Sequence, residues 1–294
     1  MIKPKARINL GLYTRGVRPV APSCNGRPVK RVMTLNAAPT PSEQEEAMEL
    51  DGSVTTASEE VAPQLSRWQR IGQSFNVAGI AFFAKMVLTD RSMAIPHLQI
   101  DDLRQVQWAA LKKAGFEGCI FDKDNTLTEP YRLELRSSAA ASLEECRAAF
   151  GKAKIVLYSN SAGLEQFDPE GVEAEELEEV LGIAVLRHKE KKPAGGPEDV
   201  ERHFGCKAEK LIMIGDRFLT DVAFGNRLGM LTIRPEPFTS EGETTAVRAA
   251  RAVEGAFVAR CRSREILPPA HALVAGANTL ASFLKELDDN IATR

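Results

Sequence analysis

The sequence of 294 residues lacks the signatures of several protein classes. Its five cysteines are scattered and include no Cys-x-x-Cys pair, so they predict neither a disulfide framework nor a zinc site. The formal net charge of −2 is far from the strongly basic balance of nucleic-acid-binding proteins, and we expect no nucleic-acid partner. A chain of this length can build one large domain or two small ones.

The first 42 residues contain no acidic side chain and no long apolar run, although they carry eight lysines and arginines. A secretory signal needs an apolar core, so residues 1–42 are instead typical of an organellar transit peptide. Pro4, Pro19, Pro22 and Pro28 interrupt any continuous amphipathic helix, which favours a plastid over a mitochondrion as the destination. The alternative is a basic, disordered arm that remains on the mature protein.

Large apolar residues are also scarce in residues 43–64, which are acidic and which we predict to be a disordered linker. Residues 65–90 differ, because apolar side chains recur there every three or four residues, on one face of a predicted helix. That face carries Trp68, Ile71, Phe75, Ala78, Phe82 and Met86. Its purely apolar run is too short to span a membrane, which needs roughly 20 such residues. It either lies in a membrane interface or packs on the domain core.

From residue 118 onward, apolar runs alternate with helical patterns. The predicted strands are 118–122, 154–158, 183–186, 211–215 and 230–233, and the predicted helices are about 137–150, 172–181, 197–204 and 220–228. Such alternation predicts an α/β fold with a doubly wound, Rossmann-like parallel sheet of about five strands and helices on both faces. The connections are too short for a cap domain. We place this domain over residues 91–240, followed by a helical extension over 241–294.

Polar residues stand where the predicted strands end, which is where ligands bind on parallel sheets. Taken singly, each has an ordinary explanation as a turn, a helix cap or a solvated residue. Together, however, polar groups follow four successive predicted strands, and this pattern predicts that they meet in one crevice. The set is Asp122 and Asp124 after the first strand, Ser159 and Asn160 after the second, Lys192 after the third, and Asp216 and Asp221 after the fourth.

Asp122 and Asp124 are one residue apart, and two ionised carboxylates at that spacing repel each other. A fold tolerates the pair if a cation lies between them or if one of them is protonated. Mg²⁺ suits the first case, because it prefers oxygen ligands and is often bound by one or two carboxylates together with a substrate phosphate.

The stretch "FDKDNTLT" at 121–128, with "SN", "KKP" and "GDRFLTD" further on, resembles the haloacid-dehalogenase-like hydrolase superfamily, whose phosphatase motif is DxDx[TV]. Within it, the chain is most similar to the organellar phosphatidylglycerophosphate phosphatases of mitochondria and plastids. The resemblance covers about residues 66–235. It leaves the N-terminal arm and the C-terminal extension without a counterpart.

The resemblance implies a role for each predicted site residue. Asp122 would attack phosphorus and form an aspartyl-phosphate, and Asp124 would serve as general acid and then general base. Asp216 would complete a Mg²⁺ site with the Asp122 carboxylate and the Asp124 main-chain carbonyl. Asp221 would lie behind these ligands or bind the ion through a water molecule. Ser159 and the main-chain amide of Asn160 would hold phosphoryl oxygens. Lys192 would neutralise the phosphoryl group, with Lys191 as the competing candidate for that role.

A phosphatase of this family would convert phosphatidylglycerophosphate to phosphatidylglycerol at a membrane surface. The open crevice suits a lipid head group, the 65–90 segment would hold the crevice at the bilayer, and the basic stretch 248–264 would either contact anionic lipid or form a solvated or packed helix. Two alternatives remain from the residues alone. One is a soluble capless phosphatase for a small ester or a phosphoprotein, and the other is a non-catalytic organellar membrane-binding protein.

Overall fold

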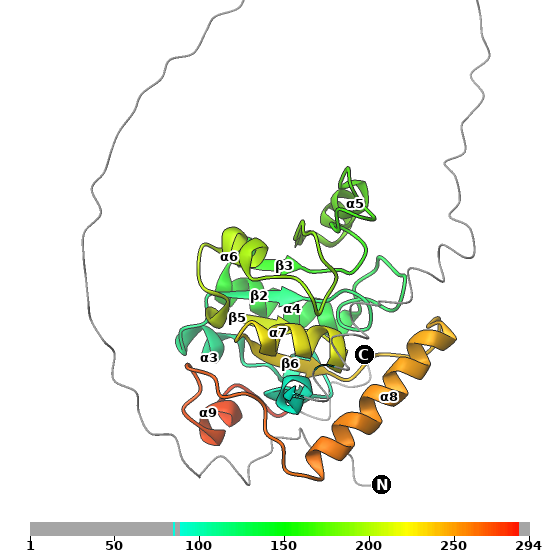
Figure 1. The fold of residues 1–294 in the computed structure, drawn as a ribbon. Coiled ribbons are helices and arrows are strands. Elements are labelled where there is room, and N and C mark those ends of the chain that lie inside the picture. The colour runs from blue at the N-terminus through cyan, green and yellow to red at the C-terminus, as the bar shows by residue number, and fades with distance from the viewer. Residues whose placement is uncertain (1–84, 86–88, 288–294) are drawn as a thin grey trace, which may run out of the picture. The chain divides into compact units, whose positions relative to one another are not determined.

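The structure is a computed structural model that describes residue 85 and residues 89–287 (Figure 1). The predicted transit peptide, the predicted linker and nearly all of the 65–90 segment lie outside the described residues. In the part of the chain that the structure describes, no helix is both long and apolar enough to cross a membrane.

Six parallel strands form a single sheet in the order β1-β6-β5-β2-β3-β4. Their bounds are β1 Leu98–Ile100, β2 Gly118–Phe121, β3 Ile155–Leu157, β4 Ala184–Val185, β5 Leu211–Ile214 and β6 Leu231–Pro235. The α/β class and the five predicted strands are confirmed, and the described residues add a sixth strand. That strand, β1, is an edge strand of three residues, too short to carry a periodic signal, and it is defined by its pairing with β6.

The helices flank this sheet. They are α3 Trp108–Lys113, α4 Ser137–Phe150, α5 Val172–Leu181, α6 Glu198–Phe204, α7 Ala223–Arg227, α8 Thr245–Arg262 and α9 Ala277–Ser282. Short 3-10 turns are η1 Arg91–Ala94, η2 Leu103–Gln105, η3 Lys152–Lys154 and η4 Ala208–Lys210, and η5 Phe218–Val222 is a π-helical turn. The helix predicted over 220–228 therefore begins as a π-turn and continues as α7.

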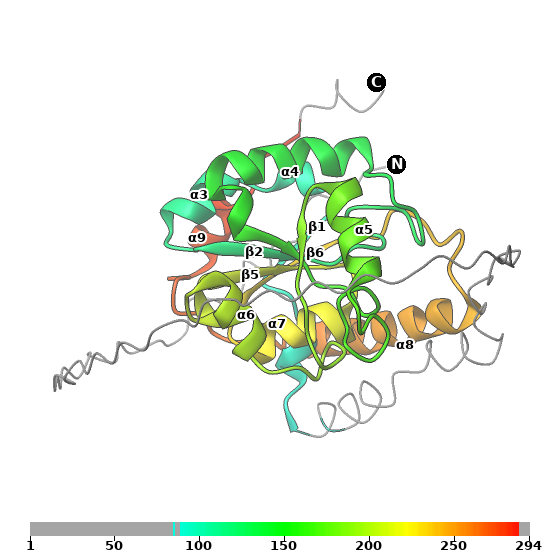
Figure 2. The ribbon, with the colours of Figure 1, turned by 90° about the horizontal axis from the view of Figure 1, so that it is seen from above.

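The two faces of the sheet are buried under different helices, as expected when side chains alternate along a strand. On β2, Cys119 and Phe121 belong to the apolar cluster that also contains Leu143 of α4, whereas Ile120 belongs to the cluster with Phe204 of α6. Figure 2 shows α3 and α4 on one side of the sheet and α6 and α7 on the other. The strand is buried at all four of its positions, so β2 lies at the centre of the domain.

The register of the central strands brings their carboxyl ends to one level. Phe121 of β2 pairs with Leu157 of β3 and with Ile214 of β5. The residues that follow each strand therefore leave the sheet at the same edge. Within the described residues, no domain is inserted in the connections that follow β2 and β3, which agrees with the predicted absence of a cap.

Candidate active site

Three carboxylates converge at this edge of the sheet. One oxygen from each of Asp122, Asp216 and Asp221 lies within 4.8 Å of the other two. Asp122 directly follows β2, and its N–H still donates to the Ile214 carbonyl at 2.8 Å, as a further rung of the ladder. The close approach of Asp221 requires glycine at position 215, because a Cβ there would lie 2.4 Å from the Asp221 Cγ.

The π-turn η5 directs Asp221 back toward the end of β5. The Asp221 N–H donates to the Arg217 carbonyl at 3.2 Å, and the Arg217 N–H donates to Asp221 Oδ2 at 3.1 Å. Asp221 is thus held in place by main-chain hydrogen bonds while its other oxygen faces the site. π-turns are rare and often occur at functional sites.

Lys192 brings a positive charge to Asp122 and Asp221 of this cluster. Its fully buried Nζ donates to Asp122 Oδ1 at 2.7 Å and to Asp221 Oδ1 at 2.6 Å. Burial alone would lower the pKa of Lys192, but the two carboxylates raise it above its ordinary value, so the amine stays charged. Lys191 lies elsewhere, with its Nζ 4.1 Å from the centre of the Phe167 ring.

The predicted phosphate-binding residues Ser159 and Asn160 follow β3 at the same edge. The Asn160 side-chain oxygen accepts from the Lys192 N–H at 2.8 Å, so this amide positions the lysine backbone. Ser159 Oγ accepts from the Ser161 N–H at 3.2 Å, and His188 Nε2 lies 2.8 Å from the Ser159 carbonyl oxygen. His188 thus holds the loop that carries Ser159.

Asp124 lies apart from the three-carboxylate cluster. Its Oδ1 accepts from Lys123 Nζ at 2.6 Å and from the Tyr131 N–H at 3.0 Å, and its side chain is 44% exposed. An exposed carboxylate two residues from Asp122 lies where the predicted proton donor would be needed. The ligand predicted from Asp124 is its main-chain carbonyl, and that role stays a prediction.

Burial and mutual repulsion raise the pKa values of two carboxylates at the site, Asp122 and Asp216. Burial, opposed by Lys192 and reinforced by repulsion from Asp221, raises the pKa of Asp122 to about 6. Burial likewise raises the pKa of Asp216 to about 7, against the lowering effect of Arg251. Both shifts mean that burial and neighbouring negative charge disfavour the ionised forms.

A divalent cation would stabilise the ionised forms of these carboxylates. The buried Asp216 Oδ2 accepts no hydrogen bond among the described residues, although it forms an ion pair with Arg251. The cluster offers only carboxylate oxygens, which are the ligands that Mg²⁺ prefers. Asp122, Asp216 and Asp221 therefore fit a hard divalent cation.

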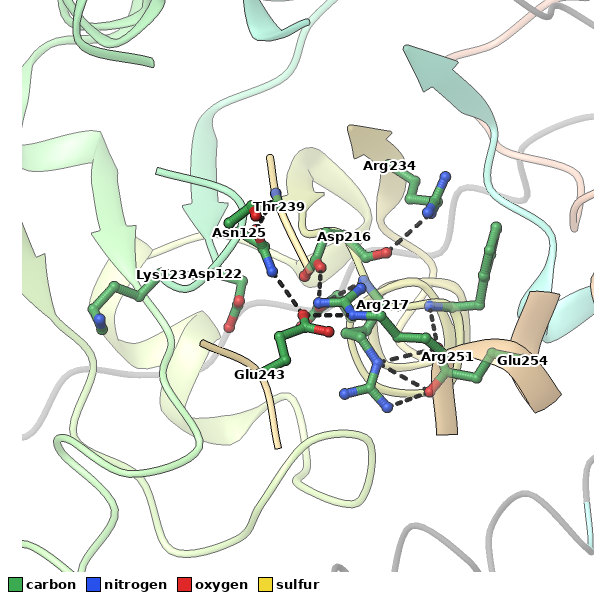
Figure 3. A network of polar contacts seen from close by, with 12 residues as sticks. Asp122, Lys123, Asn125, Asp216, Arg217, Arg234, Thr239, Glu243, Arg251 and Glu254 are labelled. Atoms are coloured by element: carbon green, nitrogen blue, oxygen red, sulfur yellow. Dashed lines mark hydrogen bonds and ion pairs between the residues drawn. The ribbon is translucent and has the colours of Figure 1, made fainter. Parts of the chain in front are cut away.

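A network that the sequence does not predict reaches the site from the C-terminal segment (Figure 3). Arg251 of α8 forms an ion pair with Asp216, and its Nε donates to Glu243 Oε1 at 2.7 Å. Asn125 Nδ2 also donates to Glu243 Oε1, at 2.7 Å. Glu243 and Arg251 are more than 100 residues from the motif in the chain, so no local spacing indicates that they meet it.

Comparison with known proteins identifies the family. A family model described as mitochondrial PGP phosphatase matches residues 78–238, more than half of the chain. The chain belongs to the PGP phosphatase family. The family confirms the predicted resemblance and the predicted enzyme class, a phosphatase. The match ends before α8, so Glu243 and Arg251 lie outside the matched residues.

Curated relatives agree with this assignment. The chain is 52% identical to phosphatidylglycerophosphate phosphatase 1, chloroplastic, of Chlamydomonas reinhardtii over 76% of this chain and 82% of the relative. It is 45% identical to the chloroplastic/mitochondrial phosphatidylglycerophosphate phosphatase 1 of Arabidopsis thaliana over 74% of this chain and 62% of the relative. A probable mitochondrial phosphatidylglycerophosphatase of Schizosaccharomyces pombe is 26% identical over 52% of this chain and 79% of the relative. The predicted plastid location, with the mitochondrion as alternative, agrees with these names.

Proposed function

We propose that this PGP phosphatase family member is a Mg²⁺-dependent enzyme that hydrolyses phosphatidylglycerophosphate to phosphatidylglycerol and phosphate in a plastid or mitochondrion. The observation that carries the proposal is the meeting of Asp122, Asp216 and Asp221 with the buried amine of Lys192 at the strand ends. The relatives named for this lipid support the choice of substrate.

In the proposed reaction, Asp122 is the nucleophile. Lys192 binds its Oδ1, so we assign the attack on phosphorus to Oδ2. The bond between phosphorus and the glycerol oxygen breaks as the aspartyl-phosphate forms, and Asp124 gives a proton to the departing oxygen. Asp124 then takes a proton from water as that water attacks phosphorus, which releases phosphate and restores the Asp122 carboxylate.

The cation would be held by the Asp122 and Asp216 carboxylates and the Asp124 main-chain carbonyl, with Asp221 behind them. When bound, it supplies positive charge that cancels the repulsion between an anionic nucleophile and an anionic phosphate. Lys192 adds a second positive charge from the protein itself. Ser159 Oγ and the main-chain amide of Asn160 would donate to the phosphoryl oxygens.

A lipid substrate requires that the crevice meet a membrane, and the outer face of α8 supports this part of the proposal. Its inner face packs Val258 and Cys261 against Phe218, whereas Arg248 is exposed and Val253 is 55% exposed. A cavity of about 250 Å³ also lies at this helix. It is lined by Arg91, Phe257, Arg260, Cys261 and Arg264. Basic side chains with apolar neighbours are suited to an anionic lipid surface.

The test is phosphate release from phosphatidylglycerophosphate in liposomes, measured beside a panel of soluble phosphate esters. We expect the lipid to give the highest kcat/KM, and Asp122→Asn to abolish turnover while circular dichroism shows an unchanged fold. The amide has the same size as the carboxylate but is a poor nucleophile. A wild-type preference for a soluble ester would contradict the lipid assignment, and substantial activity in Asp122→Asn would contradict the covalent mechanism.

A further inference from the structure

The C-terminal segment reaches the catalytic carboxylates through one arginine (Figure 3). Arg251, on α8, places a terminal nitrogen of its guanidinium on Asp216 Oδ2, and its Nε donates to Glu243 Oε1 at 2.7 Å. The side chains of Asp216 and Glu243 are 1% and 3% exposed, whereas that of Arg251 is 19% exposed. Arg251 therefore lies at the boundary between the buried carboxylates and solvent.

Glu243 holds one side of this guanidinium in place. Its Oε1 also accepts from Asn125 Nδ2 at 2.7 Å, and Asn125 directly follows Asp124 in the chain. The Asn125 side-chain oxygen accepts in turn from the Thr239 N–H at 3.1 Å. The Nε of Arg251 is thus anchored through Glu243 to the loop that carries Asp122 and Asp124, while one terminal nitrogen lies on Asp216.

A divalent cation would change the balance of charge at the site. The four carboxylates of Asp122, Asp216, Asp221 and Glu243 face only two protein cations, Lys192 and Arg251. A divalent cation on Asp216 would offset this excess of carboxylates and would compete with Arg251 for the same carboxylate. The guanidinium nitrogen displaced from Asp216 would then be available to a phosphate dianion, and the arginine fork matches phosphate oxygens well.

We propose that Arg251 is a phosphate-binding residue of the active site, which pairs with Asp216 before cation and phosphate bind and with the phosphate afterwards. The proposal rests on the proposed function in one respect, because it requires cation and phosphate to share this crevice. It assigns a site role to a residue beyond the family match, which ends at residue 238. Glu243 is a positioning residue, since it acts by holding the guanidinium.

Competition between Arg251 and the cation for Asp216 distinguishes a phosphate-binding role of Arg251 from a structural one. If Arg251 only attached α8 to the domain, its loss would weaken the binding of every ligand at the site. If Arg251 binds phosphate and competes with the cation, its loss weakens phosphate binding and leaves Mg²⁺ binding equal or tighter. The two ligands therefore respond in different directions.

The experiment uses the full-length protein and two simple probes, Mg²⁺ alone and inorganic phosphate in the presence of Mg²⁺, each titrated by calorimetry. For Arg251→Ala we expect the phosphate Kd to rise at least about tenfold, as for loss of a charged hydrogen bond, and the Mg²⁺ Kd to stay the same or fall. Arg251→Lys keeps the charge without the fork and should give an intermediate phosphate Kd. The control is Arg202→Ala, which removes an exposed charge from α6 and should change neither value by more than about twofold.

A phosphate Kd within twofold of wild type in Arg251→Ala would overturn the proposal. So would a similar loss of affinity for both ligands in a variant whose circular dichroism matches wild type. If Arg251→Ala does not fold, the double variant Arg251→Ala/Glu243→Gln removes one of the two carboxylates left without this cation and permits the same comparison. Neither probe is a lipid, so a wild-type protein that fails to hydrolyse the lipid would contradict the proposed substrate and leave this test intact.

Discussion

The amine of Lys192 lies 2.7 Å from the Asp122 carboxylate, although 70 residues separate the two in the chain. Lys192 is fully buried and also binds Asp221 at 2.6 Å, so a single cation joins residues that follow β2, β4 and β5. Such a buried group both neutralises the carboxylates and depends on them, because an unpaired buried charge is costly.

Replacing Lys192 with methionine should therefore reduce both stability and activity. Asp122 and Asp221 would lose the buried cation that binds both of them, and we expect the free energy of unfolding to fall by about 3–5 kcal/mol in urea titrations. Removal of a group that stabilises phosphoryl charge should lower kcat at least about 100-fold. Lys191→Met is the matched control, because its amine lies over Phe167, and a larger loss there would assign the phosphate role to Lys191 instead.

Asp216→Asn should weaken cation binding. The substitution keeps the size of the side chain but removes one of the three carboxylates that a divalent ion would bind. In wild type we expect Mg²⁺ to raise the melting temperature and a chelator to abolish activity, because a ligand of the native state stabilises it by mass action. The rise in melting temperature should be smaller in Asp216→Asn and unchanged in Glu170→Gln, an exposed acid elsewhere. Full activity in excess chelator would show that these carboxylates hold no essential metal.

Much of the fold could be predicted from local patterns. The buried residues Ala139, Leu143, Cys146 and Phe150 recur at helical spacing, and α4 has the bounds that this spacing predicts. The helix α5 lies between Gly171 and Gly182, both in the left-handed region, and its bounds also agree with the prediction. The strand ends could be predicted because polar residues directly follow apolar runs there.

The remaining features depend on contacts distant in sequence. β1 has only three residues and is defined by its pairing with β6, so its own sequence carries little signal. Arg251 could be predicted to lie on a basic helix, but its contact with Asp216 depends on the path of the chain after β6. The choice between Lys191 and Lys192 likewise depended on the loop geometry, which Asn160 holds through the Lys192 N–H.

His97 should make the protein less stable in acid. Burial, together with repulsion from His271, lowers the pKa of His97 to about 3, although its hydrogen bond to the Pro269 carbonyl acts against this. The Thr232 N–H donates to Nδ1 at 3.1 Å, so the folded state requires the neutral ring. Below pH 6.5 the unfolded chain binds a proton at this residue that the native state does not, and stability should fall by about 1.4 kcal/mol per pH unit between pH 6.5 and 3.

The measurement is the free energy of unfolding of wild type and His97→Gln across this pH range. Glutamine does not titrate, so the variant should be less stable at pH 7 but should lose less stability per pH unit. Asp122, Asp216 and His188 are present in both proteins, and their contributions cancel in the difference between the two slopes, whereas the repulsion between His97 and His271 is part of that difference. Equal slopes would contradict the assignment of this pH dependence to His97.

Arg260 and Arg264 should contribute to binding of anionic membranes. Both line the cavity beside α8 and both are exposed. A basic residue near an anionic surface contributes about 1 kcal/mol, so Arg260→Ala/Arg264→Ala should weaken binding to phosphatidylglycerol liposomes roughly 30-fold. The difference should shrink at high salt. Arg202→Ala removes an exposed charge from α6 and serves as control, and an equal effect there would mean that α8 has no special role.

The 65–90 segment is the other proposed membrane contact. Its predicted apolar face includes Phe75 and Phe82, and burial of a large apolar side chain contributes about 1.5–3 kcal/mol. Phe75→Asp/Phe82→Asp should therefore release the protein from liposomes and slow hydrolysis of the lipid. A soluble phosphate ester should still be hydrolysed at the wild-type rate, because the Asp122 crevice is built from other residues.

The informative quantity is the ratio of lipid to soluble-ester activity in a variant that circular dichroism shows to be folded. A fall in this ratio supports an interfacial helix. If both activities fall together, the segment packs on the domain core, which is the alternative that its apolar face also allows. If neither activity changes and liposome binding persists, membrane attachment resides elsewhere, and the Arg260/Arg264 variant then tests whether α8 alone provides it.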